Sequence, residues 1–138
     1  MRTLSVPGAN REAMIDQARA GAPEEVCGVL GGRREGREAT VGTVIRVPNV
    51  ASEPRRRYEL DAEGLFAAIE RIEGAGDSVV GFYHSHPAGP PAPSATDRAL
   101  ASWPGRSYVI VSLAGPPSLS SWCWDGERFR EERVASVA

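Results

Sequence analysis

The two histidines of this chain stand one residue apart, in the stretch YHSHPAGPPAPSATD over residues 83–97. If this stretch begins as a β-strand, His84 and His86 leave the same face, with Cα atoms about 6.5–7 Å apart. Ten residues separate His86 from Asp97, and their prolines and glycine favour a stiff turn over a long helix. The turn can therefore return the Asp97 carboxylate to the face that carries the histidines.

Two imidazoles and one carboxylate supply three ligands of a tetrahedral Zn²⁺ ion and leave the fourth position for water. This open arrangement is typical of hydrolytic zinc sites, because the ion lowers the pKa of the bound water. A second interpretation needs no metal, since Ser94 is a good helix N-cap and Asp97, three residues later, can complete a capping arrangement. The shared strand face of both histidines favours the metal site, with His84, His86 and Asp97 as ligands.

The segments that must position these residues alternate between predicted strands and helices. Asp61 is a suitable N-cap for a helix in which Leu65, Phe66, Ile69 and Ile72 are expected to face the core. A short strand is predicted over residues 57–60, and Gly31 and Gly32 are expected to end the strand before them. Further strands are predicted near residues 3–5 and over 25–32, 37–49, 78–86 and 107–113, with a hairpin over 119–134 and helices over 9–20 and 94–102.

This pattern predicts a single α/β domain of the α+β type over residues 1–138, with a central mixed β-sheet flanked by helices. The net charge of −2 and the isoelectric point near 5.7 argue against nucleic acid or an anionic membrane as a partner. No stretch approaches eighteen apolar residues, and the N-terminal segment lacks an apolar signal region, so a cytoplasmic protein is expected. Cys27 and Cys123 form no CxxC pair, and Cys27 is expected to pack as a small apolar side chain.

The motif HSHP, six residues, Ser94, two residues and Asp97 resembles the signature of the JAMM metalloproteases, also called MPN-plus domains. That signature includes an upstream glutamate in an ExCGxL context, and PEEVCGVLGG supplies it in the register of Glu25 rather than Glu24. The resemblance implies a fold like that of JAMM and cytidine-deaminase domains. It also implies that His84, His86 and Asp97 bind Zn²⁺, that Glu25 is the general acid/base and that Ser94 helps to hold the oxyanion.

The same resemblance implies a substrate. JAMM proteases cleave the peptide or isopeptide bond after the C-terminal Gly-Gly of ubiquitin-like β-grasp proteins, and compact bacterial members process small sulfur-carrier proteins of this kind. A zinc-dependent peptidase or isopeptidase is therefore expected. The family grips the substrate's tail near the segment that here contains Arg55, Arg56, Arg57 and Tyr58. The narrow cleft is expected to admit only residues without Cβ before the scissile bond, and to accept several residues after it. A DNA-repair-associated relative and a non-catalytic MPN scaffold are the alternative functions.

Overall fold

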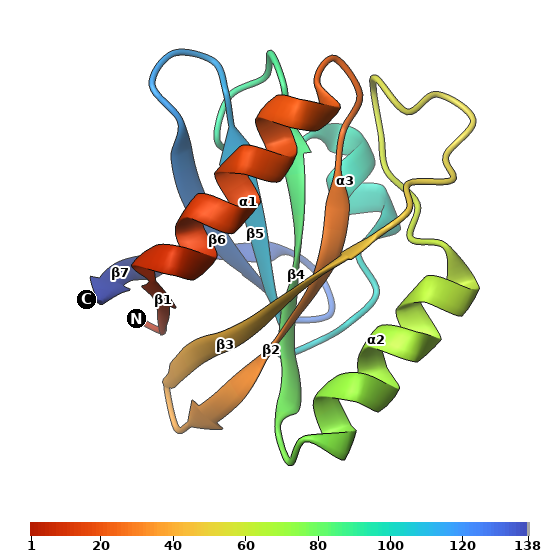
Figure 1. Cartoon of the computed structure of the whole chain (residues 1–138). Coiled ribbons are helices and arrows are strands. Elements are labelled where there is room, and N and C mark those ends of the chain that lie inside the picture. Colours follow the sequence, from red (N-terminus) through yellow and green to blue (C-terminus); the bar gives the residue numbers. More distant parts are fainter. Residues whose placement is uncertain (138) are drawn as a thin grey trace.

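The computed structural model describes residues 1–137 and contains, within them, seven strands and three helices. The three helices are interspersed among the first strands, and the last three elements are strands (Figure 1). The elements are β1 (Thr3–Pro7), α1 (Gly8–Gly21), β2 (Cys27–Glu35), β3 (Glu38–Val47), α2 (Ala62–Gly74), β4 (Ser78–His86), α3 (Ala95–Leu100), β5 (Ser107–Ser112), β6 (Ser118–Trp124) and β7 (Phe129–Val137).

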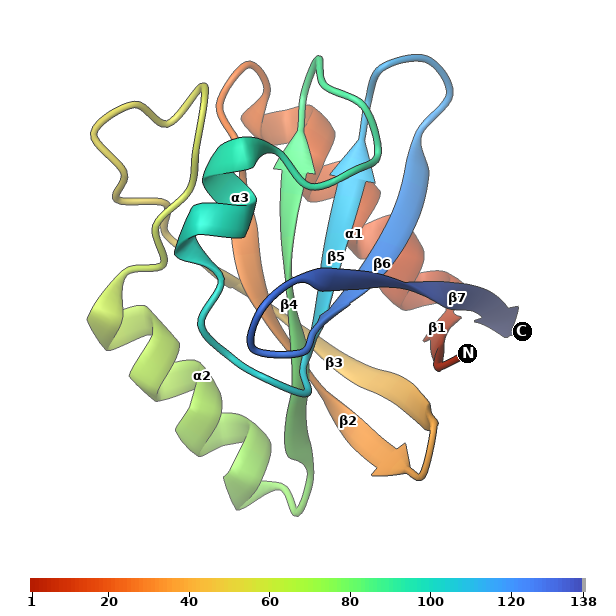
Figure 2. The same cartoon turned by 180° about the vertical axis from the view of Figure 1, so that it is seen from behind.

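The strands form one mixed sheet in the order β1-β3-β2-β4-β5-β6-β7, which closes because β1 also pairs with β7. β2 is antiparallel to β3 and β4, whereas β4 and β5 run parallel. α1 lies against one side of the sheet in Figure 1, and α3 faces the viewer in the reverse view of Figure 2. The predicted single domain with a mixed sheet flanked by helices is confirmed as a fold class.

The core has two apolar clusters, one for each long helix. α1 contributes Met14, Ile15 and Ala18 to the first cluster, where they meet inward residues of β1, β2, β4 and β5. α2 contributes Ala68 and Ile72 to the second cluster, together with Phe82, Tyr108 and Trp124 from the strands. Burial of these side chains supplies the main stabilisation of the fold. None of the helices within residues 1–137 is long and apolar enough to cross a bilayer.

The prediction that Phe66 faces the core is wrong, because 64% of this residue is exposed. The face of α2 that contacts the second cluster carries Leu65, Ala68, Ile69 and Ile72. These positions follow the i, i+3, i+4, i+7 spacing of one helix face, and Phe66 lies about 100° around the axis from Leu65.

The predicted strand over residues 57–60 is also absent, and only an isolated bridge joins Leu60 to Asn49. The backbone of this segment is bound by a side chain instead. The amide oxygen of Asn49 accepts hydrogen bonds from the N–H groups of Ala51 and Glu59, at 3.1 and 3.0 Å. Its nitrogen donates to the carbonyl of Arg57 at 3.1 Å. The segment therefore folds as a compact loop around one amide.

Two predicted element ends differ from the structure. Gly31 and Gly32 do not end β2, which continues to Glu35; they mark a shift in its pairing with β3 and β4. A Cβ at Gly32 would collide with the carbonyl of Thr40, so the glycine permits this close approach. α3 ends at Leu100 rather than Ser102, because the N–H of Ser102 donates to the Tyr108 hydroxyl at 3.2 Å instead of continuing the helix.

Candidate metal centre

β4 carries both histidines to one end of the sheet. The pairing of β4 with β2 shifts between Leu30 and Gly31 of β2. From Gly81 to the end of β4, the side chains alternate regularly between the two faces. Phe82, His84 and His86 share the α2 side, whereas Tyr83 packs in the α1 cluster. Loop 48–60, the loop after β4 and the start of α3 meet at this end of the molecule (Figures 1 and 2). The expected placement of two imidazoles on one strand face is therefore present.

Three donor atoms converge beyond the end of β4. Nε2 of His84 and Nε2 of His86 lie 3.1 Å apart, and Oδ2 of Asp97 lies 3.1 Å from each of them. Ligand atoms about 2.0–2.1 Å from a tetrahedral ion are separated by about 3.3 Å, so this triangle is close to the size that one ion requires. The three residues are only 2%, 6% and 8% exposed, which makes them a buried set of candidate ligands.

The position of Asp97 follows from the cap of α3. The N–H of Ser94 donates to Oδ2 of Asp97 at 2.9 Å, and the N–H of Asp97 donates to Oγ of Ser94 at 3.0 Å. This is the reciprocal capping box that the sequence suggested as an alternative to a metal site. The structure contains both features, because the capping carboxylate also faces the two histidines.

Each histidine ring is held by a contact on its far side. Nδ1–H of His86 donates to the carbonyl of Pro90 at 2.8 Å, which leaves the Nε2 lone pair directed at Asp97 and His84. The ring of His84 stacks on Tyr58, with centroids 4.3 Å apart, while its Nδ1 has no partner. In the neutral His86 ring, the Nε2 lone pair faces the Asp97 carboxylate at 3.1 Å and is repelled by it. Either a proton on Nε2, which makes the contact a hydrogen bond, or a cation shared by both atoms removes that repulsion. The donor set therefore fits a metal ion.

The acid–base properties of the three residues reflect burial and mutual contact. Burial alone would raise the pKa of Asp97, but hydrogen bonds with both histidines outweigh it and hold this pKa well below its usual range. Burial lowers the pKa of His84 more than its contact with Asp97 raises it. For His86, burial also lowers the pKa, but hydrogen bonds to Asp97 and Pro90 reverse the net direction. Neutral His84 beside an ionised carboxylate is the state that binds a metal.

Glu25 lies beside this triangle, two residues before β2. One of its carboxylate oxygens and the ring nitrogens of His84 and His86 all lie within 4.8 Å of one another. Glu25 is buried and Glu24 is exposed, in agreement with the register chosen from the sequence. Burial, partly offset by the charge on His86, raises the pKa of Glu25 to about 7, and its Oε1 has no hydrogen-bond partner. A carboxyl group with this pKa can both accept and donate a proton near neutrality.

Two hydrogen bonds with loop 48–60 hold the backbone of Glu25 in place. The N–H of Glu25 donates to the carbonyl of Pro54 at 2.7 Å, and Nδ2 of Asn49 donates to the carbonyl of Glu25 at 2.9 Å. Sequence reasoning missed Asn49. The available signal was an asparagine directly after the proline that ends β3, a position typical of side chains that bind the backbone of a turn.

The structure divides the predicted substrate-binding residues between two cavities. Arg57 and Tyr58 line a cavity of about 450 Å³ with Leu65, Trp103 and Tyr108. Arg55 and Arg56 instead line a second cavity of about 350 Å³, together with Glu25, His86 and Ser94. Both cavities adjoin the donor triangle, since Tyr58 stacks on His84 in the first and His86 borders the second.

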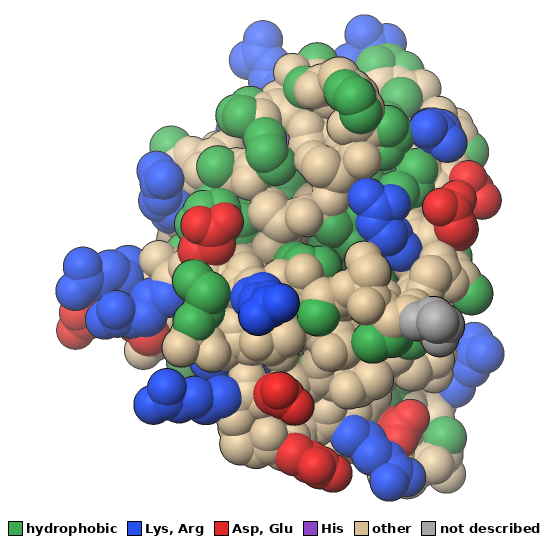
Figure 3. Space-filling model, turned by 90° about the vertical axis from the view of Figure 1, so that its left-hand side faces the viewer, with side chains coloured by type: hydrophobic (Ala, Val, Ile, Leu, Met, Phe, Trp, Pro, Cys, Tyr) green, Lys and Arg blue, Asp and Glu red, His purple; other side chains and the backbone are tan. Residues whose placement is uncertain are grey.

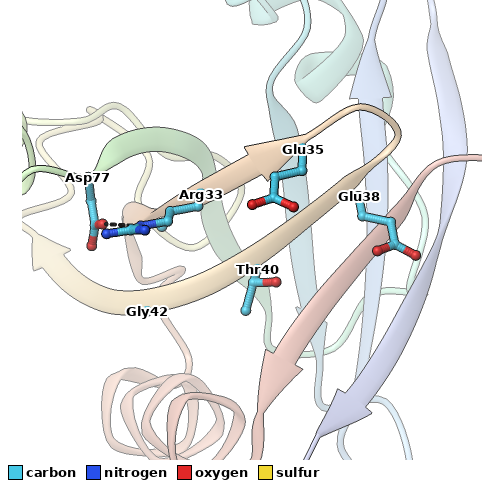
Figure 4. Close-up of a pocket in the computed structure, with 7 residues that line it drawn as sticks. Arg33, Glu35, Glu38, Thr40, Gly42 and Asp77 are labelled. Atoms are coloured by element: carbon cyan, nitrogen blue, oxygen red, sulfur yellow. Dashed lines mark hydrogen bonds and ion pairs between the residues drawn. The ribbon is translucent and has the colours of Figure 1, made fainter.

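A third cavity, of about 320 Å³, lies at the opposite end of the sheet (Figure 4). It is lined by Glu35, Glu38 and an ion pair of 3.4 Å between Arg33 and Asp77, without a histidine or cysteine.

Arginine and acidic side chains are interspersed on the face shown in Figure 3, which lacks a continuous basic patch. Cys27 and Cys123 are buried and form no disulfide. Burial raises the pKa of Cys27 to about 12, so Cys27 stays a neutral thiol and packs as predicted.

Comparison with known proteins gives a consistent result. Residues 7–125 match Prok-JAB, the family of prokaryotic homologs of the JAB domain. The chain is 49% identical over 136 residues to a desampylase of Haloferax volcanii, covering 96% of this chain and 95% of that protein. It is 38% identical over 108 residues to the CysO-cysteine peptidase of Mycobacterium tuberculosis, covering 75% of this chain and 69% of that protein.

Among solved structures, a protein of Desulfitobacterium hafniense superposes with a TM-score of 0.88 and 34% identity, covering 97% of this chain and 92% of that one. The sequence resemblance to the JAMM group is thereby confirmed. The matched range, residues 7–125, spans Glu25, both histidines, Ser94 and Asp97. The chain belongs to the Prok-JAB family of prokaryotic JAB-domain homologs.

Proposed function

We propose that the protein is a zinc-dependent peptidase that hydrolyses the bond after the C-terminal Gly-Gly of a ubiquitin-like β-grasp sulfur-carrier protein. The observation that carries the proposal is the buried triangle of His84, His86 and Asp97, with the carboxyl group of Glu25 beside it. Relatives named desampylase and CysO-cysteine peptidase act on conjugates of such carriers, which supports this substrate class.

His84, His86 and Asp97 would hold the ion, because two imidazoles and a carboxylate suit Zn²⁺ and leave room for water. When bound, zinc supplies a Lewis acid that lowers the pKa of water and stabilises negative charge on the attacked carbonyl. The hydrogen bond from Nδ1–H of His86 to Pro90 leaves Nε2 as the ring atom that can bind the ion when the ring is neutral. The capping box keeps Oδ2 of Asp97 directed at both rings.

Glu25 moves the protons of the reaction. Its carboxylate takes a proton from the attacking water and returns it to the leaving amine when the C–N bond breaks. Its pKa of about 7 without metal suits both transfers, and a nearby cation lowers that value and favours the ionised base. The Ser94 oxygen accepts from the Asp97 N–H, so its own O–H is available to donate to the oxyanion.

Arg57 and Tyr58 border the larger cavity, where the tail before the scissile bond would lie. Among the described residues that line that cavity, Arg57 is the one basic residue and Glu59 offsets its charge, so the lining lacks the basic groove that a nucleic-acid backbone requires. A scaffold role would fit a degenerate motif, but all five motif positions are occupied by the expected residues. A cytoplasmic location remains a prediction.

The decisive experiment mixes the zinc-loaded protein with β-grasp carriers that bear residues after Gly-Gly and weighs the products by mass spectrometry. We expect a carrier that ends at Gly-Gly and an intact released residue or protein. Glu25→Gln is the matched control, because it removes the base while keeping the size of the side chain. Cleavage at another position, or equal cleavage by Glu25→Gln, would contradict the proposal.

A further inference from the structure

The cavity that contains Glu25 and His86 has two chemically different parts. Its wall is apolar and stiff, built by Pro87, Pro90 and Pro93 of the loop after β4. Arg55 and Arg56, from loop 48–60, line its other border and also line a neighbouring hollow. A small cavity with apolar walls, two guanidinium groups and access to the catalytic carboxyl group suits a small ligand with one negative charge.

The two arginines are only weakly paired with acidic side chains among residues 1–137, although Glu24 and Glu53 line a neighbouring hollow with them. Arg55 forms no ion pair with any of the residues 1–137. Arg56 has only a loose contact of 3.8 Å with Glu53, and its side chain is 79% exposed. Glu53 also contacts Arg57 at 3.6 Å, so one carboxylate is shared by two guanidinium groups. This border of the cavity therefore keeps a positive charge that a ligand can use.

The backbone of the arginine segment is nevertheless fixed relative to the catalytic residue. The carbonyl of Pro54, directly before Arg55, accepts the hydrogen bond from the N–H of Glu25. Asn49 then binds the carbonyls of both Glu25 and Arg57. Hydrogen bonds therefore hold the backbone at Pro54 and Arg57, on either side of the two arginines. This fixes the backbone of Arg55 and Arg56 next to Glu25, which protonates the leaving amine.

We propose that this cavity binds the residue released by the cleavage, and that Arg55 and Arg56 recognise its free α-carboxylate. The inference rests on the proposed function. Water adds its oxygen to the glycine carbonyl carbon, the C–N bond breaks, and the amine leaves with a proton from Glu25. If one residue follows Gly-Gly, its carboxylate lies about one residue length, roughly 3.5 Å, beyond the nitrogen that leaves.

This assignment has a consequence for the kind of substrate. A carrier extended by a single residue presents its carboxylate next to the scissile bond, where the arginines can pair with it. A lysine side chain joined through Nε places four methylenes beside that nitrogen and no carboxylate at the same distance. The protein should therefore prefer single-residue extensions over isopeptide conjugates, while the open cavity still accepts different side chains.

The test uses a carrier that the wild-type protein cleaves after Gly-Gly, prepared with one added alanine ending either in a free carboxylate or in a carboxamide. Recognition of the charge is measured by the kcat/KM for the carboxylate substrate divided by the kcat/KM for the carboxamide substrate. We expect the wild-type ratio to exceed that of the double variant Arg55→Ala/Arg56→Ala by about three- to tenfold at low salt, because exposed ion pairs are weak and screened. Comparing the two proteins cancels the intrinsic difference in reactivity between the substrates.

Two further variants make the test specific. Arg37→Ala removes one arginine charge from the turn between β2 and β3, at the other end of the sheet, and should keep the wild-type ratio. Arg55→Glu/Arg56→Glu should shift the ratio further towards the carboxamide. An unchanged ratio in both double variants, with normal thermal unfolding, would overturn the inference while leaving the peptidase function intact. If no carrier is cleaved after Gly-Gly by the wild-type protein, the proposed function itself fails and the inference fails with it.

Discussion

Ser94 and Asp97 are joined by two reciprocal hydrogen bonds, and the bond from the Ser94 N–H ends on the same Asp97 oxygen that faces both histidines. The helix cap and the metal-binding geometry therefore share one atom. A backbone N–H cannot be removed by changing the Ser94 side chain, so the orientation of Oδ2 survives loss of the hydroxyl. Mutation of Ser94 and of Asp97 can therefore distinguish the contribution of the helix cap from that of metal binding.

Ser94→Ala should keep the metal and lose stability, whereas Asp97→Asn should lose most of the metal affinity. Loss of an N-cap hydroxyl costs about 1 kcal/mol of unfolding free energy. An asparagine oxygen carries no negative charge, so zinc affinity should fall by at least about tenfold. Zinc titration with a competing chelator and urea unfolding measure the two effects. Equal zinc affinities for the two variants would contradict the assignment of Asp97 as a ligand.

His86→Ala should purify with little or no zinc, while the wild-type protein holds about one ion per chain. The fold should persist, because His86 lies at the end of β4 and outside both apolar clusters. Elemental analysis gives the zinc content and circular dichroism reports the fold. Acid should release zinc from the wild-type protein, since protonated imidazoles cannot bind it. Full zinc occupancy in His86→Ala would show that the ligand set is wrong.

Glu25→Gln should retain zinc and lose at least about a hundredfold in turnover. The amide preserves the size of the side chain but cannot take a proton from water. Glu24→Gln is the matched control, because Glu24 is exposed and adjacent. Rates measured at zinc saturation, with the metal content of each variant determined in parallel, separate chemistry from binding. A normal rate for Glu25→Gln together with a low rate for Glu24→Gln would show that the register is wrong.

The sequence was sufficient to predict the mixed sheet and the convergence of His84, His86 and Asp97, because both depend on local spacing. Alternation along 78–86 predicts one face for His84 and His86, and a capping box is a short motif that needs no tertiary information. Closure of the sheet could not be predicted, since the parallel pairing of β1 with β7 joins the two ends of the chain. The exposed position of Phe66 depends on which face of α2 meets the sheet, and that choice is made by tertiary packing.

Asn49 illustrates the part of the site that spacing cannot reveal. Its amide group replaces a strand pairing that the pattern RYEL suggested, and it does so through contacts eight to twenty-four positions away. Asn49→Asp should retain the two accepted hydrogen bonds and lose both donated ones. We expect about 1–2 kcal/mol lower unfolding stability and a reduced kcat/KM at unchanged zinc content. Normal activity and stability in this variant would exclude a positioning role for Asn49.

The requirement for glycine before the scissile bond should arise from Tyr58. Its ring stacks on His84 and borders the cavity proposed for the substrate's tail, so a tail that lies there must pass close to this ring. A tail residue without Cβ can pass this ring, whereas a branched side chain would collide with it. Replacing either glycine of the carrier with valine should lower kcat/KM by at least about a hundredfold in the wild-type protein.

Tyr58→Ala should recover part of the activity towards the valine-containing carrier, although its activity towards Gly-Gly falls because His84 loses its stacking partner. Tyr58→Phe keeps the ring and is the matched control, so it should discriminate against valine as strongly as the wild-type protein. The informative quantity is the ratio of kcat/KM for the glycine and valine carriers, measured at zinc saturation for all three proteins. If Tyr58→Ala keeps the wild-type ratio, selection of glycine depends on another part of the cleft, and Tyr58 only holds the His84 ring.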